Sequence, residues 1–186
     1  MPRRGGRVRR PLVGLALSLA CVGTAGCGAD RASRDAVPPV AVPRPPHGAF
    51  VATVERVVDG DTFVARRDGR RLRVRLIGVD APESVRPGAP VDCYGPEAAR
   101  LLRDLLPPGV TLRAAYQGEP RQDRFGRELW DVWLRDGRFL QAELVRAGAA
   151  GPHPYPPQTR YADLLDGLDV RARRAGAGRY GACPAQ

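Results

Sequence analysis

The chain has 186 residues, of which 30 are basic and 20 are acidic, so its formal net charge is +10. All basic residues are arginine, and the hydrophobic fraction of 43% excludes both disorder throughout and a protein with many membrane spans. The length suits one folded domain with appendages. Residues 1–26 carry five arginines and no acid, so the remainder has a net charge of +5. A charge of this sign favours polyanionic partners such as nucleic acid, but it is also common on solvated surfaces.

Residues 1–26 have the pattern of an export signal. Arginines before residue 11 precede the apolar stretch Leu12–Ala20, which is shorter than the roughly 20 residues of a membrane span. Thr24-Ala25-Gly26-Cys27 resembles a bacterial lipoprotein cleavage box, with a lipidated Cys27 as the first mature residue. We expect a lipid anchor at Cys27 that places the protein on the outer face of the cell membrane. Secretion without an anchor, or a retained anchor, are the alternatives.

Residues 27–48 are rich in proline and poor in residues that could pack. This composition predicts an extended stalk, or a disordered spacer with no further role. We therefore place the folded domain at residues 49–183.

The domain begins with three expected strands, at residues 50–56, 62–67 and 71–77. Asp68-Gly69 predicts a two-residue hairpin turn between the second and the third strand. The resulting register sets Thr62 opposite Arg75, and strict alternation would put Asp61 and Arg75 on opposite faces. A bulge or bend would have to bring them together. The core face is Phe63, Ala65, Leu72, Val74 and Leu76, and the other face carries Thr62, Arg66, Arg71, Arg73 and Arg75.

The second half of the domain mixes helices and strands. Its expected elements are a helix from Pro96 to about Leu105, strands at 111–116 and 129–134, helices at 139–147 and 160–175, and an irregular loop at 151–157. Five strands with about three helices at one side predict an α+β fold. We expect a five-stranded barrel of the oligonucleotide/oligosaccharide-binding (OB) type.

The cysteines favour an exported protein. Cys21 and Cys27 belong to the signal region, which leaves Cys93 and Cys183 in the folded domain. An even pair in an oxidising compartment is a disulfide candidate. No Cys-x-x-Cys or Cys/His spacing that would indicate a zinc site is present.

Three clusters of charged residues could carry chemistry. Asp59-Gly60-Asp61-Thr62 offers carboxylates that can hold a hard cation, although Gly beside Asp is also ordinary turn chemistry. Residues 75–83 bring Arg75, Asp80 and Glu83 to the same end of the hairpin, and a solvated strand end with paired charges is the alternative. Residues 123–127 contain an arginine fork that could clamp a phosphate, or they form a charged hairpin tip.

In this order and spacing, the three clusters resemble the staphylococcal nuclease (thermonuclease) family. Further matches are Tyr94-Gly95-Pro96-Glu97-Ala98 and Leu144-Val145-Arg146-Ala147-Gly148, and the resemblance covers about residues 50–181. It implies a monomeric, Ca²⁺-dependent phosphodiesterase that hydrolyses single-stranded DNA and RNA to 3′-phosphate products.

The resemblance also implies roles for the acidic residues. Asp61 and Asp80 are the expected Ca²⁺ ligands, together with the backbone carbonyl of Ala81, which stands where the family often has Thr. Glu83 matches the glutamate that positions or deprotonates the attacking water.

The residues expected to hold the substrate follow from the same resemblance. Arg75 and Arg127 match the two arginines that hold the scissile phosphate, and Arg124 is a further candidate contact. Tyr155 could stack on a base. Phe125 occupies a position where the family commonly has Tyr.

Two interpretations without catalysis remain open. The same fold could bind nucleic acid or another polyanion without cleaving it, or the chain could be a structural envelope lipoprotein that Ca²⁺ only stabilises. The presence of Glu83 argues against a pure binding module, because binding needs no residue that positions water.

Overall fold

The computed structural model describes residues 42–84 and 90–184. The expected signal segment, Cys27 and most of the expected linker lie outside these residues. Within the described ranges, no helix has the length and apolar character needed to cross a membrane.

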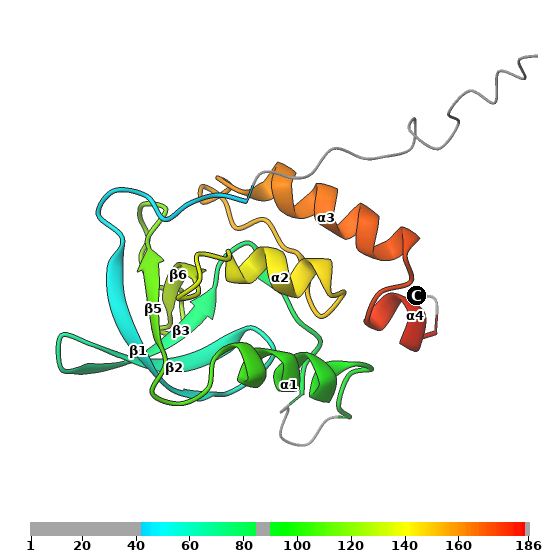
Figure 1. Cartoon of the computed structure of the whole chain (residues 1–186), viewed down its shortest axis with the longest axis horizontal. Helices are drawn as coiled ribbons and strands as arrows, with labels where there is room; N and C mark the ends of the chain where they lie inside the picture. The colour runs from blue at the N-terminus through cyan, green and yellow to red at the C-terminus, as the bar shows by residue number, and fades with distance from the viewer. Residues whose placement is uncertain (1–41, 85–89, 185–186) are drawn as a thin grey trace, which may run out of the picture. The chain divides into compact units, whose positions relative to one another are not determined.

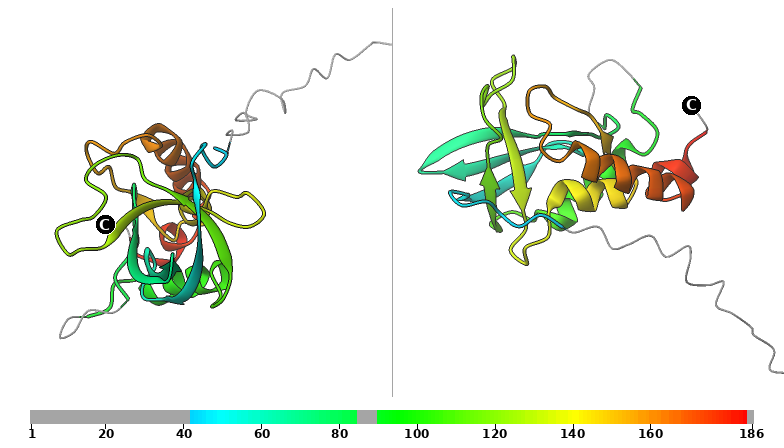
Figure 2. Two further views of the ribbon diagram at one scale, coloured as in Figure 1. Left: turned by 90° about the vertical axis from the view of Figure 1, so that its left-hand side faces the viewer. Right: turned by 90° about the horizontal axis from the view of Figure 1, so that it is seen from above.

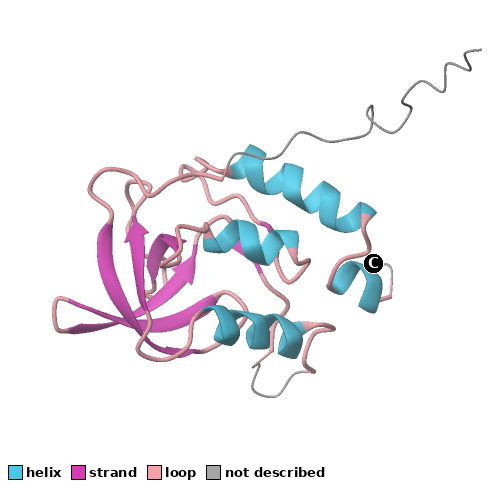
Figure 3. Cartoon of the chain, viewed as in Figure 1, coloured by secondary structure: helices cyan, strands magenta, loops and turns pink. Residues whose placement is uncertain are grey.

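Five strands close into a barrel, as predicted (Figures 1 and 3). They are β1 (Phe50–Val57), β2 (Thr62–Arg67), β3 (Arg70–Leu76), β5 (Thr111–Ala115) and β6 (Glu128–Trp133). Their order around the barrel is β1-β2-β3-β6-β5, and β5 pairs with β1 to close it. Only the β3–β6 contact is parallel among these pairs, so both strands run toward the same end of the barrel.

The β2–β3 hairpin has the predicted turn and register. Asp68 and Gly69 both have positive φ angles, 49° and 74°, as a tight two-residue turn requires. Thr62 lies opposite Arg75, and the amide of Leu76 donates to the carbonyl of Asp61 (3.0 Å). The hairpin therefore places Asp61 and Arg75 at the same end of the sheet.

Four helices gather at one side of the barrel (Figures 1 and 2). Three of them confirm the sequence prediction to within two residues at each end, namely α1 (Gly95–Leu105), α2 (Leu140–Arg146) and α3 (Ala162–Arg174). The short helix α4 (Arg179–Ala182) was not predicted, because four residues give no readable periodicity.

A second, two-stranded sheet lies outside the barrel. β4 (Val79–Asp80) pairs antiparallel with β7 (Gly151–Pro152), so that Asp80 lies opposite Gly151. The expected irregular loop at 151–157 is thus wrong for its first two residues. Two-residue strands are too short for a sequence pattern, and their pairing arises from the surrounding fold.

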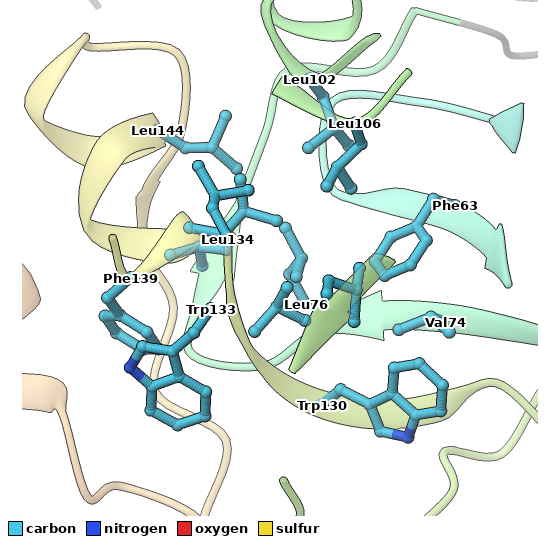
Figure 4. Packing of buried hydrophobic residues seen from close by; sticks show 14 of the residues in the cluster. Phe63, Val74, Leu76, Leu102, Leu106, Trp130, Trp133, Leu134, Phe139 and Leu144 are labelled. Carbon is cyan, nitrogen blue, oxygen red and sulfur yellow. The ribbon is translucent and has the colours of Figure 1, made fainter. Parts of the chain in front are cut away.

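The core lies inside the barrel and between the barrel and its helices (Figure 4). Phe63, Val74 and Trp130 fill the barrel, while Leu102 of α1 and Leu144 of α2 pack from the helices. All five side chains are fully buried, so the hydrophobic effect fixes the helices against the barrel end that holds the charged clusters.

Two contacts tie the ends of the domain to its body. The indole N–H of Trp133 donates to the carbonyl of Pro43 (2.7 Å), so the last part of the expected spacer contacts the domain. This bond satisfies the donor of a buried indole. The candidate disulfide is present between Cys93 and Cys183, and it joins the segment before α1 to the end of α4.

Candidate active site

The turn before β2 is packed too tightly for any residue but glycine at position 60. A Cβ at Gly60 would lie 2.6 Å from the Cβ of Ala81 and 3.0 Å from that of Ala98 in α1. This close approach sets Asp61 directly beside the chain that follows β4.

Asp61 is buried, with 6% of its surface exposed. One carboxylate oxygen accepts from the hydroxyl of Thr62 (2.8 Å), and the other accepts from the amide of Ala81 (3.0 Å) and lies 3.2 Å from Nη1 of Arg75. Burial raises the pKa of Asp61, and the Arg75 guanidinium with these two hydrogen bonds only partly opposes that effect. Further positive charge at this position would therefore stabilise the ionised carboxylate.

The guanidinium of Arg75 links Asp61 to Asp80. Nη2 donates to the Asp80 carboxylate (2.6 Å), while Nη1 donates to the carbonyls of Leu76 (2.9 Å) and Val79 (2.6 Å). The chain can fold back in this way because it turns at Gly78, whose φ is +81°. Arg75 thus occupies the centre of the site, and both carboxylates and both carbonyls fix the orientation of its guanidinium.

Of the two expected routes by which Asp61 and Arg75 could meet, the structure has the bend, at residues 59–61, and not the bulge. The β2–β3 register runs without interruption from Thr62 to Arg67, and the irregularity in the sheet lies in β1, between Val54 and Arg56. Asp61 precedes β2, so strand alternation does not fix the direction of its side chain. No bulge in the hairpin is needed.

The loop that carries Glu83 is held from two sides. The amide of Glu83 donates to the carboxylate of Asp92 (3.1 Å), and its carbonyl accepts from the amide of Asp92 (3.0 Å). On the other side, the amide and hydroxyl of Ser84 donate to Asp59, which is also hydrogen-bonded to the side chain of Glu83. Burial works to raise the pKa of Asp59, but the hydrogen bonds with Glu83, Ser84 and Gly60 outweigh it and lower that pKa.

Sequence reasoning missed these supports of Glu83. Asp59 lies within the first charged cluster, so its involvement was open to prediction. Asp92 lies outside the clusters, and only its place beside Cys93 could have drawn attention to it.

Arg127 lies at the end of the charged loop that precedes β6. Its Nε pairs with Asp123 (2.6 Å), which also accepts from the amides of Phe125 and Arg127. Burial works to raise the pKa of Asp123, but these hydrogen bonds outweigh it and lower that pKa. Of the described acids, Asp123 is the one that pairs with Arg127, so the structure does not join Arg127 directly to Asp61 or Asp80.

Strand pairing nevertheless brings the Arg127 loop alongside the hairpin. Leu129 lies opposite Arg75 in the parallel β3–β6 pair, so Arg127, immediately before β6, lies two residues from the strand partner of Arg75. The ring of Phe125 is 65% exposed, and the guanidiniums of Arg124 and Arg127 lie 4.7 and 5.4 Å from its centre. The loop thus presents an aromatic side chain and the cation of Arg124 to solvent, while Arg127 is half-buried.

The loop that contains Tyr155 reaches the site through β7. The amide of His153 donates to the carbonyl of Gly78 (2.9 Å), in the same turn that positions Asp80. His153 is exposed, and Tyr155 is half-buried, with its carbonyl accepting from the amide of Gln158 (2.7 Å). Tyr155 therefore lies on the loop that follows β7, three residues beyond the end of that strand, and its stacking on a base stays a prediction.

The donor set of the site suits a hard cation. Asp61 and Asp80 converge on one guanidinium, and Ala81 lies beside Asp61, so carboxylate and carbonyl oxygens are the available donors. Ca²⁺ prefers such oxygen ligands. In the described part of the chain, no three His, Cys, Asp or Glu side chains group closely enough to hold a metal.

Comparison with known proteins identifies relatives over most of the folded domain. Residues 73–179 match the family model described as staphylococcal nuclease homologue. The thermonuclease of Staphylococcus intermedius is 40% identical over 121 residues, which are 65% of this chain and 70% of that protein. The thermonuclease of Staphylococcus hyicus is 36% identical over the same shares of both chains. Endonuclease YncB of Bacillus subtilis (strain 168) is 34% identical over 112 residues, 60% of this chain and 52% of that protein.

Proposed function

Because the chain belongs to the staphylococcal nuclease family and is therefore a hydrolase of phosphodiester bonds, we propose that it cleaves single-stranded DNA and RNA in a Ca²⁺-dependent reaction that leaves 3′-phosphates. One observation carries this proposal most strongly. Arg75 is fixed between Asp61 and Asp80, next to the loop of Glu83. A cation held by the two carboxylates would join Arg75 and Glu83 and add positive charge, and these groups together suit phosphate hydrolysis.

The residues around Arg75 divide the chemical work. Asp61, Asp80 and the carbonyl of Ala81 would hold Ca²⁺, which supplies positive charge where negative charge develops on the phosphate. Arg75 donates hydrogen bonds to the phosphate oxygens from a guanidinium that its backbone contacts already orient. Preorganised donors of this kind stabilise the transition state without reorganising during the reaction.

Glu83 and Arg127 complete the proposed mechanism. In its ionised form Glu83 accepts a proton from the water that attacks phosphorus. The bond from phosphorus to the 5′-oxygen breaks, and that oxygen leaves as a hydroxyl with a proton from solvent water. Asp59 and Asp92 hold the Glu83 loop in place. Arg127, oriented by Asp123, provides the second guanidinium for the phosphate.

The preference for single strands is supported by the aromatic residues at the rim. Phe125 is largely exposed, and Tyr155 lies on the loop that follows Gly151, the strand partner of Asp80. Bases that are not paired can stack on such rings regardless of sequence, whereas bases in a duplex cannot. Arg124 beside Phe125 would add a contact to the backbone.

We also propose that the protein acts outside the cytoplasm, as a monomer. The disulfide between Cys93 and Cys183 supports an oxidising compartment. A lipid anchor at Cys27 would hold it at the outer face of the membrane, and secretion without an anchor would release it. Metabolic labelling with a fatty acid, compared between the native chain and Cys27→Ser, separates the two cases.

The proposed activity is tested with purified, oxidised residues 28–186 and labelled single-stranded DNA, RNA and duplex DNA. Each substrate is incubated with Ca²⁺, with Mg²⁺ or with a chelator. The proposal predicts cleavage of both single strands in Ca²⁺ and none in the chelator. Salt-sensitive binding without cleavage would contradict it and indicate a nucleic-acid binding module instead.

A further inference from the structure

A second cleft borders the active site on the side of the C-terminus. Its volume is ≈ 620 Å³, and it is lined on one side by residues 80–82, Asp92 and Cys93, and on the other by Arg173, Arg179, Tyr180, Cys183 and Pro184. The second wall belongs to α3, α4 and the chain just after α4, at the end of the domain away from the barrel (Figure 1). The mechanism above assigns no role to this wall.

Two arginines flank one aromatic ring on that wall. The guanidiniums of Arg173 and Arg179 lie 4.5 and 4.8 Å from the centre of the Tyr180 ring. Nη2 of Arg179 also donates to the Tyr180 hydroxyl (2.7 Å), which in turn donates to the carboxylate of Asp169. The same carboxylate pairs with Nε of Arg173 (2.7 Å). The cluster is thus ordered before any ligand arrives.

This cluster has excess positive charge. Asp169 is the one described acid that pairs with both arginines, and it is buried, with 7% of its surface exposed. The side chain of Arg173 is 60% exposed. Two guanidiniums that share one carboxylate leave donors for an anion in the cleft.

The arginine wall is linked closely to the metal-binding residues. A Cβ at Gly151 would collide with Nη2 of Arg179, so this guanidinium lies directly on the backbone of Gly151. Gly151 is the strand partner of Asp80. Arg179 is therefore one strand away from the residue that we expect to bind Ca²⁺ beside the scissile phosphate.

The acids on the facing wall are already engaged. Asp80 pairs with Arg75, and Asp92 accepts from the amide of Glu83. The disulfide between Cys93 and Cys183 joins the two walls at this point, since both cysteines line the cleft. The cleft therefore has one wall that belongs to the active site and one wall that is basic and covalently held.

We propose that Arg173 and Arg179 bind a backbone phosphate of the same single strand, next to the phosphate that is cleaved. Guanidiniums recognise phosphate oxygens through paired hydrogen bonds, which suits this position better than ammonium groups would. The inference rests on the proposed nuclease function, because it names a second contact to the substrate of that reaction. It predicts that long strands bind more tightly than a dinucleotide, which cannot reach the C-terminal wall.

The test compares two double variants with the same net charge. Arg173→Gln/Arg179→Gln removes the basic wall, whereas Arg103→Gln/Arg113→Gln removes two exposed arginines on α1 and β5 that do not line the cleft. Binding of a labelled strand of about 12 nucleotides is measured by anisotropy in chelator at several salt concentrations. Cleavage of a dinucleotide is measured separately in Ca²⁺.

We expect the cleft variant to weaken binding of the strand about tenfold or more, and to lower the salt slope by roughly 0.7 for each phosphate that is no longer bound. The control variant should change both much less, and neither should alter cleavage of the dinucleotide. Equally weakened strand binding in the two variants, or an equally large decrease on the dinucleotide, would overturn the proposal.

A folding defect is recognised with a single variant. Arg173→Gln leaves Asp169 with its contacts to Tyr180 and Arg179, so it should fold and still lower the salt slope. Because binding is measured in chelator, the outcome is independent of catalysis. If the native chain binds the strand through the cleft but cleaves neither substrate, the nuclease function is refuted and the phosphate site in the cleft stands. If the native chain cleaves both substrates and the cleft variant has an unchanged salt slope, the phosphate site is refuted and the nuclease function stands.

Discussion

Asp131 gives the domain a pH-dependent stability that a single substitution should abolish. It lies in β6, fully buried, and one oxygen accepts from Nε2 of Gln117 (2.9 Å) and of Gln141 (3.4 Å). The other oxygen is buried with no hydrogen-bond partner among the described residues. Burial raises the pKa of Asp131 from 3.8 to about 7, although the bond from Gln117 and the charge of Arg160 partly oppose it.

The sign and size of the effect follow from proton linkage. Between pH about 4 and about 7 the native state holds a proton that the unfolded chain has released, so the free energy of unfolding falls as the pH rises through this window. Each unit of pKa shift corresponds to about 1.4 kcal/mol, which makes about 4 kcal/mol an upper limit for the decrease. Above pH about 7 this contribution stays constant at its lower value.

Asp131→Asn tests this reasoning because the amide stays neutral at every pH. We expect the variant to exceed the native free energy of unfolding at both pH values, and by up to about 3 kcal/mol more near pH 8 than near pH 5. Urea denaturation at both pH values measures the difference, with the exposed Asp163→Asn as the control for net charge. A difference between Asp131→Asn and the native protein that is the same at both pH values would refute the raised pKa.

Three further outcomes are expected. Reduction of the Cys93–Cys183 disulfide should lower the free energy of unfolding by up to about 4–5 kcal/mol on the chain-entropy model. A melting temperature that reductant leaves unchanged would contradict this contribution of the disulfide. Gly60→Ala should weaken Ca²⁺ binding, measured by calorimetry, because the added Cβ would push Ala81 away from Asp61. The same clash should lower the free energy of unfolding by about 1–3 kcal/mol. An unchanged Ca²⁺ affinity would show that the close approach of Ala81 to Asp61 is not needed. Arg75→Lys should lower kcat for single-stranded DNA about a hundredfold or more, since an ammonium cannot bridge two carboxylates and two carbonyls. Near-native turnover would contradict the role of the guanidinium.

The barrel and its hairpin could be predicted because local signals specify them. Asp68-Gly69 fixes the turn, the turn fixes the register, and the register fixes which residues face the core. The positions of Phe63 and Val74 inside the barrel follow from that chain of reasoning.

The arrangement of the charged groups could be predicted only in part. The sequence placed Asp61, Arg75 and Asp80 at one end of the hairpin, but not the guanidinium between the two carboxylates. That contact depends on the turn at Gly78 and on the freedom of Asp61 outside its strand. Neither has a periodic signature.

Contacts between distant segments could not be predicted. The pairing of Asp80 with Gly151 joins two strands of two residues each, which become stable only when the loops around them are packed. The cluster of Arg173, Arg179 and Tyr180 depends on α4, which is four residues long and is held by a disulfide to a cysteine 90 residues away.

In the proposed mechanism Glu83, on the loop that follows Asp80, activates the water that hydrolyses the phosphodiester bond. The most direct measurement is the turnover of labelled single-stranded DNA in Ca²⁺ by Glu83→Gln, compared with Glu97→Gln, a matched change at an exposed position of α1. We expect Glu83→Gln to lower kcat by about 10²–10⁴ with little change in strand binding, and Glu97→Gln to cleave normally to 3′-phosphate ends. Normal turnover by Glu83→Gln would contradict the role of Glu83 in activating the water.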